Sequence, residues 1–98
     1  MILIHPEAVA EARKARRRYA RLDPAVGRRF AVAYDDVIDR ITQTPDRWPA
    51  YPHVPGRYRW CRFRRFPFAG IYEVFVQVVH VLAIAPDRAE PGYWSTRQ

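Results

Sequence analysis

The sequence predicts a small α+β domain in which an antiparallel pair of helices packs on one face of a small, mainly antiparallel sheet. Three observations support this prediction: a brief apolar strand at residues 2–4, two amphipathic helical patterns within residues 6–44, and three strand patterns after residue 56. A chain of 98 residues can bury one hydrophobic core, so we expect a single domain over residues 1–98.

The first helix is predicted to begin at Pro6, because proline suits the first helical position and Glu7 favours the positive end of the helix dipole. Its apolar residues recur at spacings of three and four, which places them on one face. This stripe comprises Ala8, Ala12, Ala15, Tyr19 and Leu22.

A second helix is predicted to begin at Asp23-Pro24, which pairs a capping side chain with a proline at the first helical position. It should end at Thr44, because the residue before a proline is disfavoured in the helical region. With almost no loop between them, the two helices should form an antiparallel hairpin. The expected buried face of the second helix comprises Val26, Phe30, Ala33, Val37 and Ile41.

A proline-rich segment, residues 45–56, is predicted to be a shaped loop, because proline restricts φ and removes a hydrogen-bond donor. Trp48 is expected to anchor this loop to the core. Three strands should follow at about residues 57–66, 68–75 and 78–85. The turn between the last two contains no Gly, Asn, Asp or Pro, so turn chemistry does not fix its position.

Alternation along a strand assigns residues to the two faces of the sheet. In the first of these strands, Tyr58 and Trp60 should share one face, and Arg57, Arg59 and Cys61 should share the other. In the second strand, the residues expected on one common face are Phe68, Tyr72 and Val74.

The chain is strongly basic, with 17 Lys and Arg residues against 10 Asp and Glu residues and a net charge of +7. This balance indicates a nucleic acid, an acidic protein or an anionic surface as the partner. The guanidinium group of arginine presents a planar fork of donors that suits phosphate and carboxylate groups. The candidates for binding a target are Arg57, Arg59, Arg62, Arg64, Arg65 and Arg88.

Other classes of protein are disfavoured. A lone Cys61 rules out a disulfide framework and fits a reducing cytoplasm. The N-terminal segment has no signal-peptide pattern, and no apolar stretch is long enough to span a bilayer, so we expect no membrane partner. His5, His53 and His80 lack metal-ligand spacing, so we predict neither a metal site nor a cofactor.

Several short motifs occur in a fixed order along almost the whole chain. They are Pro6-Glu7-Ala8, Trp48-Pro49, Phe66-Pro67-Phe68, the strand Val81-Leu82-Ala83-Ile84-Ala85 followed by Arg88, and the tail Pro91-Gly92-Tyr93-Trp94 with Arg97. As an ordered set they resemble the RelE/ParE superfamily of bacterial type II toxin–antitoxin toxins, nearer the ParE-like branch. The resemblance implies a cytoplasmic toxin that is neutralised by a small, acidic antitoxin, which is partly disordered alone and folds onto the toxin.

The branches of this superfamily differ in chemistry. ParE-like members are described as poisoning DNA gyrase, whereas RelE-like members cut messenger RNA on the ribosome. RNA cleavage needs a proton acceptor, a proton donor and cations that converge on one site. Glu73 is the only acid in the three-strand region, and we expect it to pair with an arginine across the sheet. The nuclease candidates are Arg59, Arg64, Arg88 and Tyr93.

The segment after the last strand disfavours the nuclease. Many relatives place a histidine there in an Ala-Val-Ala-His context, where this chain reads Ala83-Ile84-Ala85-Pro86. The double arginine often seen next reads Asp87-Arg88-Ala89. We therefore expect a ParE-like toxin that binds gyrase as a protein rather than an enzyme. The alternatives are a RelE-like endoribonuclease and an antitoxin-binding module without toxic activity.

The expected antitoxin contacts follow from charge and apolar patterning. Apolar side chains of the antitoxin should cover the helix hairpin and the nearby sheet surface, because apolar anchors control dissociation. Its carboxylates are expected to meet Arg13, Arg17 and Arg21, which should mainly raise the association rate.

Overall fold

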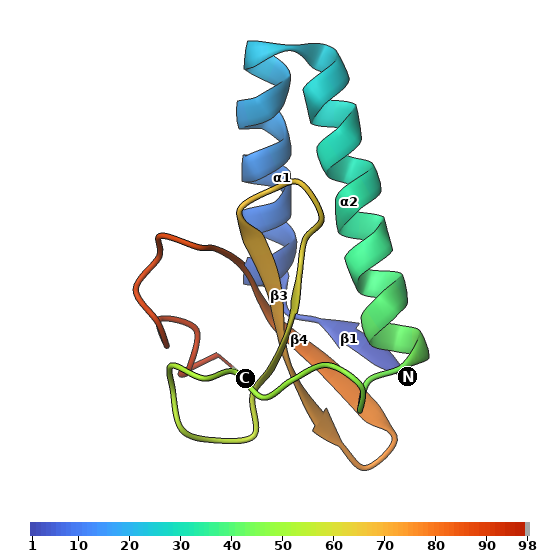
Figure 1. Cartoon of the computed structure of the whole chain (residues 1–98), viewed down its shortest axis with the longest axis vertical. Helices are drawn as coiled ribbons and strands as arrows, with labels where there is room; N and C mark the ends of the chain where they lie inside the picture. The colour runs from blue at the N-terminus through green and yellow to red at the C-terminus, as the bar shows by residue number, and fades with distance from the viewer. Residues whose placement is uncertain (98) are drawn as a thin grey trace.

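The structure, a computed structural model, describes residues 1–97. Its elements in chain order are β1 (Ile2–Ile4), α1 (Pro6–Leu22), α2 (Pro24–Gln43), β2 (Arg59–Arg62), β3 (Phe68–Phe75) and β4 (Val78–Pro86). The strands form one sheet in the order β1-β4-β3-β2, in which β1 is parallel to β4 and the other neighbours are antiparallel. The helix hairpin lies against this sheet and extends beyond it (Figure 1). The predicted α+β class is confirmed.

The helix boundaries have local causes. Asp23 ends α1 with its backbone N–H on the carbonyl of Tyr19, and it caps α2 by accepting a hydrogen bond of 2.9 Å from the N–H of Ala25. One residue therefore serves both helices, which explains the short connection. The helices approach closely because α2 carries Gly27, where an added Cβ would lie 2.7 Å from the Cβ of Ala20.

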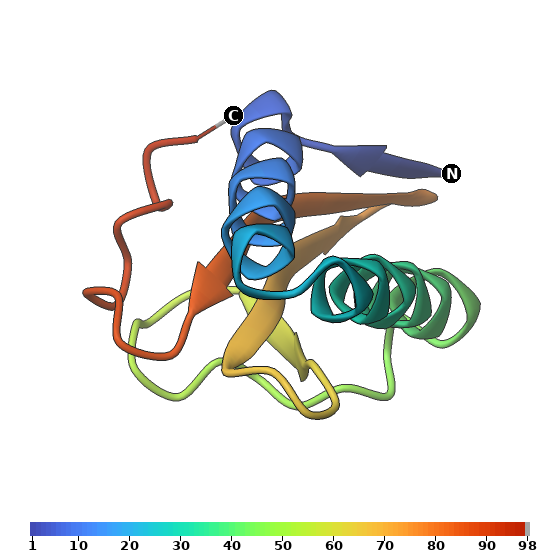
Figure 2. The same cartoon turned by 90° about the horizontal axis from the view of Figure 1, so that it is seen from above.

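The main core lies between the helix hairpin and one face of the sheet (Figure 2). Phe30 is 1% exposed and stands at its centre, with ring centroids 5.5 Å from Tyr19 and 5.4 Å from Phe63. The predicted alanine stripe of α1 is buried in this core, so residues of small volume let α1 lie close to β4. Other buried members of the core are Ala8, Ala12, Ala15, Val37, Ile41, Cys61, Tyr72, Val79, Val81 and Ile84.

A second, smaller core lies on the opposite face of the sheet and contains no helix residue. The chain tail covers this face, with Trp94 only 1% exposed. Two aromatic residues of the loop between α2 and β2 pack against it, with ring centroids at 4.9 Å for Tyr51 and 6.1 Å for Tyr58. The tail is therefore part of the folded domain.

The predicted strand faces agree with the structure. Tyr58 and Trp60 pack in the second core, Cys61 is buried in the main core, and β3 presents Phe68, Tyr72 and Val74 to the helices. Trp48 anchors its loop, with the indole N–H donating a 3.1 Å hydrogen bond to the carbonyl of Arg40.

Two details differ from the prediction. The strand expected at residues 57–66 is only Arg59–Arg62, because the chain turns directly after it, with Phe63 N–H bonded to the carbonyl of Phe68 at 2.9 Å. Glu73 lies opposite His80 in the sheet register, and no ion pair in the described part of the chain includes it, so its predicted pairing with an arginine is wrong.

The turn between β3 and β4 lies at residues 76–77, between the predicted strand bounds, and Gln77 takes a φ of 59° there without a glycine or asparagine. Its neighbour Val76 is 90% exposed, so the turn is both apolar and open to solvent.

No helix within residues 1–97 is both long and apolar enough to cross a bilayer.

Candidate functional site

A groove of about 590 Å³ runs between α1 and the segment that follows β4. Its apolar wall combines Ala15 and Tyr19 of α1 with Phe68 of β3 and Ile84 of β4. The remaining lining residues are Glu11, Lys14, Arg18, Leu22, Pro67, Pro86, Asp87, Arg88, Ala89, Glu90 and Tyr93. The groove therefore joins an apolar interior to a mostly basic helix face.

The groove exists because β1 is too short to cover β4. β1 pairs with β4 only as far as Val81, so the edge of β4 beyond that residue has no neighbouring strand. A bulge falls at the same place, where the register passes from Ile71–Ala83 to Tyr72–Val81 and leaves Leu82 without a partner in β3. Unpaired backbone groups at such an edge need other partners.

Two side chains form hydrogen bonds with the unpaired backbone groups at the start of this edge. The N–H of Ile84 donates a 3.0 Å hydrogen bond to the Glu11 carboxylate, and Arg97 Nη1 donates one of 3.0 Å to the carbonyl of Leu82. Both side chains arrive from outside the sheet, Glu11 from α1 and Arg97 from the tail. The helix and the tail therefore meet across the edge of β4.

Glu11 also holds the tail directly. Its carboxylate accepts hydrogen bonds of 2.7 Å from the Tyr93 hydroxyl and of 2.9 and 3.0 Å from the two Nη atoms of Arg97. Burial raises the pKa of Tyr93, and the hydrogen bond to Glu11 raises it further. The hydrogen bond to Glu11 also raises the pKa of Arg97. Glu11 and Tyr93 both line the groove, so this cluster forms part of its wall and favours the protonated form of Tyr93.

The rim of the groove carries free positive charge. Lys14, Arg18 and Arg88 line it and are exposed. None of the three takes part in an ion pair within residues 1–97. An apolar wall next to basic side chains without ion-pair partners suits an amphipathic segment whose polar side is acidic.

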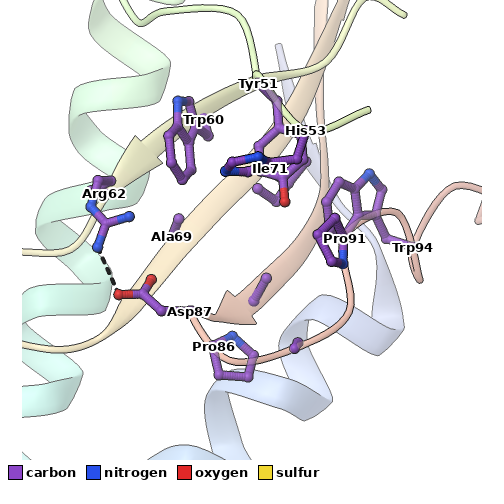
Figure 3. Close-up of a pocket in the computed structure, with 12 residues that line it drawn as sticks. Tyr51, His53, Trp60, Arg62, Ala69, Ile71, Pro86, Asp87, Pro91 and Trp94 are labelled. Atoms are coloured by element: carbon purple, nitrogen blue, oxygen red, sulfur yellow. Dashed lines mark hydrogen bonds and ion pairs between the residues drawn. The ribbon is translucent and has the colours of Figure 1, made fainter. Parts of the chain in front are cut away.

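A second hollow, of about 210 Å³, lies on the sheet face opposite the helices. Aromatic side chains surround it, including Tyr51, Trp60 and Trp94 (Figure 3). At its edge, Arg62 Nη2 lies 2.7 Å from the Asp87 carboxylate, so the arginine charge is already neutralised.

The arginines predicted to bind a target divide among several places. Arg59 donates hydrogen bonds of 3.2 and 2.6 Å to the carbonyls of Asp46 and Trp48, so it braces the proline-rich loop. Arg62 pairs with Asp87, as described above. Arg64 lies 4.0 Å from Asp36 of α2. The remaining members of the set are exposed: Arg57, Arg65 and Arg88.

The four nuclease candidates do not meet at one point. Arg88 and Tyr93 both line the groove. Arg59 is bound to the loop and Arg64 lies near α2, on the other side of the sheet from the second hollow. The Tyr93 hydroxyl donates to Glu11, which leaves it engaged.

The predicted antitoxin contacts Arg13, Arg17 and Arg21 are exposed on α1 but do not line the groove. Lys14 and Arg18, each one position further along, do line it. Sequence reasoning missed these two and Glu11. Their spacing held the signal, because positions 11, 14 and 18 flank the apolar stripe on one side of the helix.

Among residues 1–97, no group of three or more His, Cys, Asp or Glu side chains is placed to hold a metal ion.

Comparison with known proteins agrees with this architecture. The family model described as the ParE toxin of the type II toxin–antitoxin system parDE matches residues 2–91. The chain therefore belongs to the ParE toxin family, within the RelE/ParE superfamily. A solved structure, the chromosomal ParDE toxin–antitoxin system from P. aeruginosa, is similar in fold, with a TM-score of 0.67 at 17% sequence identity over 87% of this chain and 92% of that chain. No curated protein matches the sequence.

Proposed function

We propose that this ParE-family toxin is neutralised by a small acidic antitoxin, partly disordered alone, that docks in the groove beside α1, and that the free toxin inhibits DNA gyrase by protein binding. The proposal places the chain in the bacterial cytoplasm and assigns it no cofactor. The observation that carries it is the groove of about 590 Å³, with its apolar wall and basic rim.

The groove supports an antitoxin because its chemistry is complementary to a segment that folds on binding. Apolar side chains of the antitoxin would cover Tyr19, Phe68 and Ile84, which removes apolar surface from water. Carboxylates on its polar side would meet Lys14, Arg18 and Arg88.

Arg13, Arg17 and Arg21 keep a separate role in this proposal. They are exposed on the same helix but outside the groove, so their charge would attract an acidic antitoxin before it docks. Exposed charges of this kind mainly change the association rate and its salt dependence.

Gyrase inhibition is favoured over RNA cleavage because two of the four candidate nuclease residues are already engaged. Arg59 is bound to two loop carbonyls, and Tyr93 is bound to Glu11 with its pKa raised, which suits neither transition-state stabilisation nor proton donation. Within residues 1–97, the target candidates that make neither an ion pair nor a side-chain hydrogen bond are Arg57, Arg65 and Arg88. These would contact gyrase.

Two assays with purified toxin test the target. We expect inhibition of gyrase supercoiling and little cleavage of messenger RNA during translation. Arg59→Ala and Arg64→Ala should therefore have no cleavage to abolish, whereas removal of a catalytic acid or base costs about 10²- to 10⁴-fold. Strong cleavage by the wild type that falls by such a factor would establish the ribonuclease instead. Antitoxin binding with neither activity would identify a binding module that has lost toxicity.

A further inference from the structure

The net charge of this chain is concentrated at one end of the helix hairpin. Residues 13–29 contain eight basic residues and one acidic residue, a net charge of +7. The whole chain also carries +7, so the remaining nine basic and nine acidic residues balance each other. We call the eight basic residues the basic end: Arg13, Lys14, Arg16, Arg17, Arg18, Arg21, Arg28 and Arg29.

The basic end and the rest of the molecule differ in how their basic side chains are paired with carboxylates. Of the nine arginines outside the basic end, Arg40, Arg62 and Arg97 each lie within 2.9 Å of a carboxylate and Arg64 lies 4.0 Å from one. All eight members of the basic end are exposed, and within the described residues none of them takes part in an ion pair. The turn between α1 and α2, around which they gather, projects beyond the sheet (Figure 1).

This arrangement works against the stability of the isolated chain. Arg13, Arg17 and Arg21 follow one another at spacings of four, and like charges at that spacing destabilise a helix. Arg28 and Arg29 lie in the N-terminal part of α2, whose first turn has no acidic residue to favour the helix dipole. A polyanion bound here would relieve the repulsion.

We propose that the basic end binds the phosphate backbone of double-stranded DNA. Along α1, Arg13 and Arg21 are separated by about 12 Å at the helical rise of 1.5 Å per residue. A DNA duplex carries one negative charge per roughly 1.7 Å of its axis, so it presents about seven charges over that length. Seven of the eight basic residues are arginines, which bind phosphate through two parallel hydrogen bonds.

Five of these residues are also proposed antitoxin contacts, so DNA and antitoxin would compete for them, but the part of the basic end away from the groove has surroundings that favour a duplex over other polyanions. A protein partner needs apolar anchors, and the large exposed apolar residues of the hairpin are only Leu22, which lines the groove, and Val32. A single strand needs aromatic side chains on which its bases stack, and the exposed aromatic residues Phe75 and Tyr93 both lie outside the basic end.

The test uses the full chain and a fluorescein-labelled DNA duplex of mixed sequence, about 20 base pairs long, with binding followed by anisotropy at several salt concentrations. The variants are Arg28→Glu and Arg29→Glu, which lie outside the proposed antitoxin contacts. The matched control is Arg47→Glu, an exposed residue of the proline-rich loop that changes the net charge equally. Melting curves without DNA show that each variant is folded, since an acid early in α2 favours the helix dipole.

We expect Arg28→Glu and Arg29→Glu each to weaken DNA binding by about tenfold at low salt. The slope of log K against log salt should also become shallower, by about 0.9 for each phosphate group that the variant no longer binds. The Arg47→Glu control should bind like the wild type.

Equal weakening by Arg47→Glu would show that only net charge matters and would overturn the proposal, as would unchanged binding by both α2 variants. Competition by polyglutamate as strong as by unlabelled duplex would assign the surface to an acidic protein. Tighter binding of a single strand would exclude the duplex. The assay contains neither gyrase nor antitoxin, so its outcome is independent of the function proposed above.

Discussion

At the scale of single residues, Glu11 connects α1 to the edge of β4 and to the tail at the candidate site. Within residues 1–97 it is the one carboxylate that contacts the β4 edge, the Tyr93 hydroxyl and the Arg97 guanidinium together. The side chains of Arg97 and Glu11 are 11% and 22% exposed, so water screens their interaction little. Glu7 also lies 3.5 Å from Arg97, but its side chain is 65% exposed.

We therefore predict that Glu11→Ala lowers the free energy of unfolding by about 2–3 kcal/mol, because it removes charge-assisted hydrogen bonds and leaves the Ile84 N–H without its partner. Glu7→Ala, the control, should change it by less than about 1 kcal/mol, since exposed ion pairs contribute little. Urea unfolding of both variants measures the difference. Equal losses would mean that the tail is held by general charge attraction and not by Glu11.

Tyr72 provides a test of the core through pH. Its hydroxyl donates a 2.6 Å hydrogen bond to the carbonyl of Pro45, and burial raises its pKa from 10.0 to about 12. Because the folded state disfavours tyrosinate, the unfolded chain loses this proton first. The stability contributed by Tyr72 is then complete below pH 10 and is lost as the pH rises from 10 to about 12.

We expect the free energy of unfolding of the wild type to fall over that pH range, and to fall less steeply in Tyr72→Phe. Denaturation curves at a series of alkaline pH values measure both slopes. Identical slopes would show that Tyr72 ionises as readily in the folded protein as in the unfolded chain.

At the scale of secondary structure, the alanine stripe of α1 sets how closely this helix can approach the sheet. Ala12 is 8% exposed and belongs to the main core, whereas Ala10 lies exposed on the same helix. We predict that Ala12→Glu lowers the melting temperature strongly, because an unpaired buried charge costs several kcal/mol. Ala10→Glu is the matched control and should leave the melting temperature nearly unchanged. An unaltered melting temperature for Ala12→Glu would contradict the packing of the hairpin.

Periodicity predicted the helices and β3 well, because their signals are local. The cap at Asp23 and the alternation around Tyr72 are visible within a few residues of sequence. β2 is shorter than predicted because it ends at a turn that is closed by the hydrogen bond between Phe63 and Phe68. The alternation of side chains in the sequence does not show where this turn lies.

The candidate site was less predictable because it depends on contacts between distant segments. Glu11 and Arg97 are separated by 86 positions in the chain, and no pattern within α1 indicates which segment will pack beside it. For the same reason, Arg59 and Arg62 looked alike in the sequence, yet one braces a loop and the other pairs with Asp87.

At the scale of the whole molecule, the uneven charge should govern how fast an acidic partner arrives. Arg17→Glu with Arg21→Glu reverses two exposed charges outside the groove. We expect the antitoxin to associate more slowly and with a weaker salt dependence, while its dissociation rate changes little. Stopped-flow binding at several salt concentrations measures these rates. An unchanged association rate would place the antitoxin elsewhere, along residues 57–65.

The most direct test of the groove as the antitoxin site compares two exposed apolar residues of the hairpin. Leu22 is 80% exposed and lines the groove, whereas Val32 is 69% exposed on α2 and does not. Because both are exposed, a charge at either position should leave the fold intact. The affinity of each variant for the proposed acidic antitoxin is measured by calorimetry. Docking of the antitoxin in the groove predicts that Leu22→Glu weakens binding by about tenfold or more, while Val32→Glu binds like the wild type. Equal affinities of the two variants, or a larger loss with Val32→Glu, would contradict it.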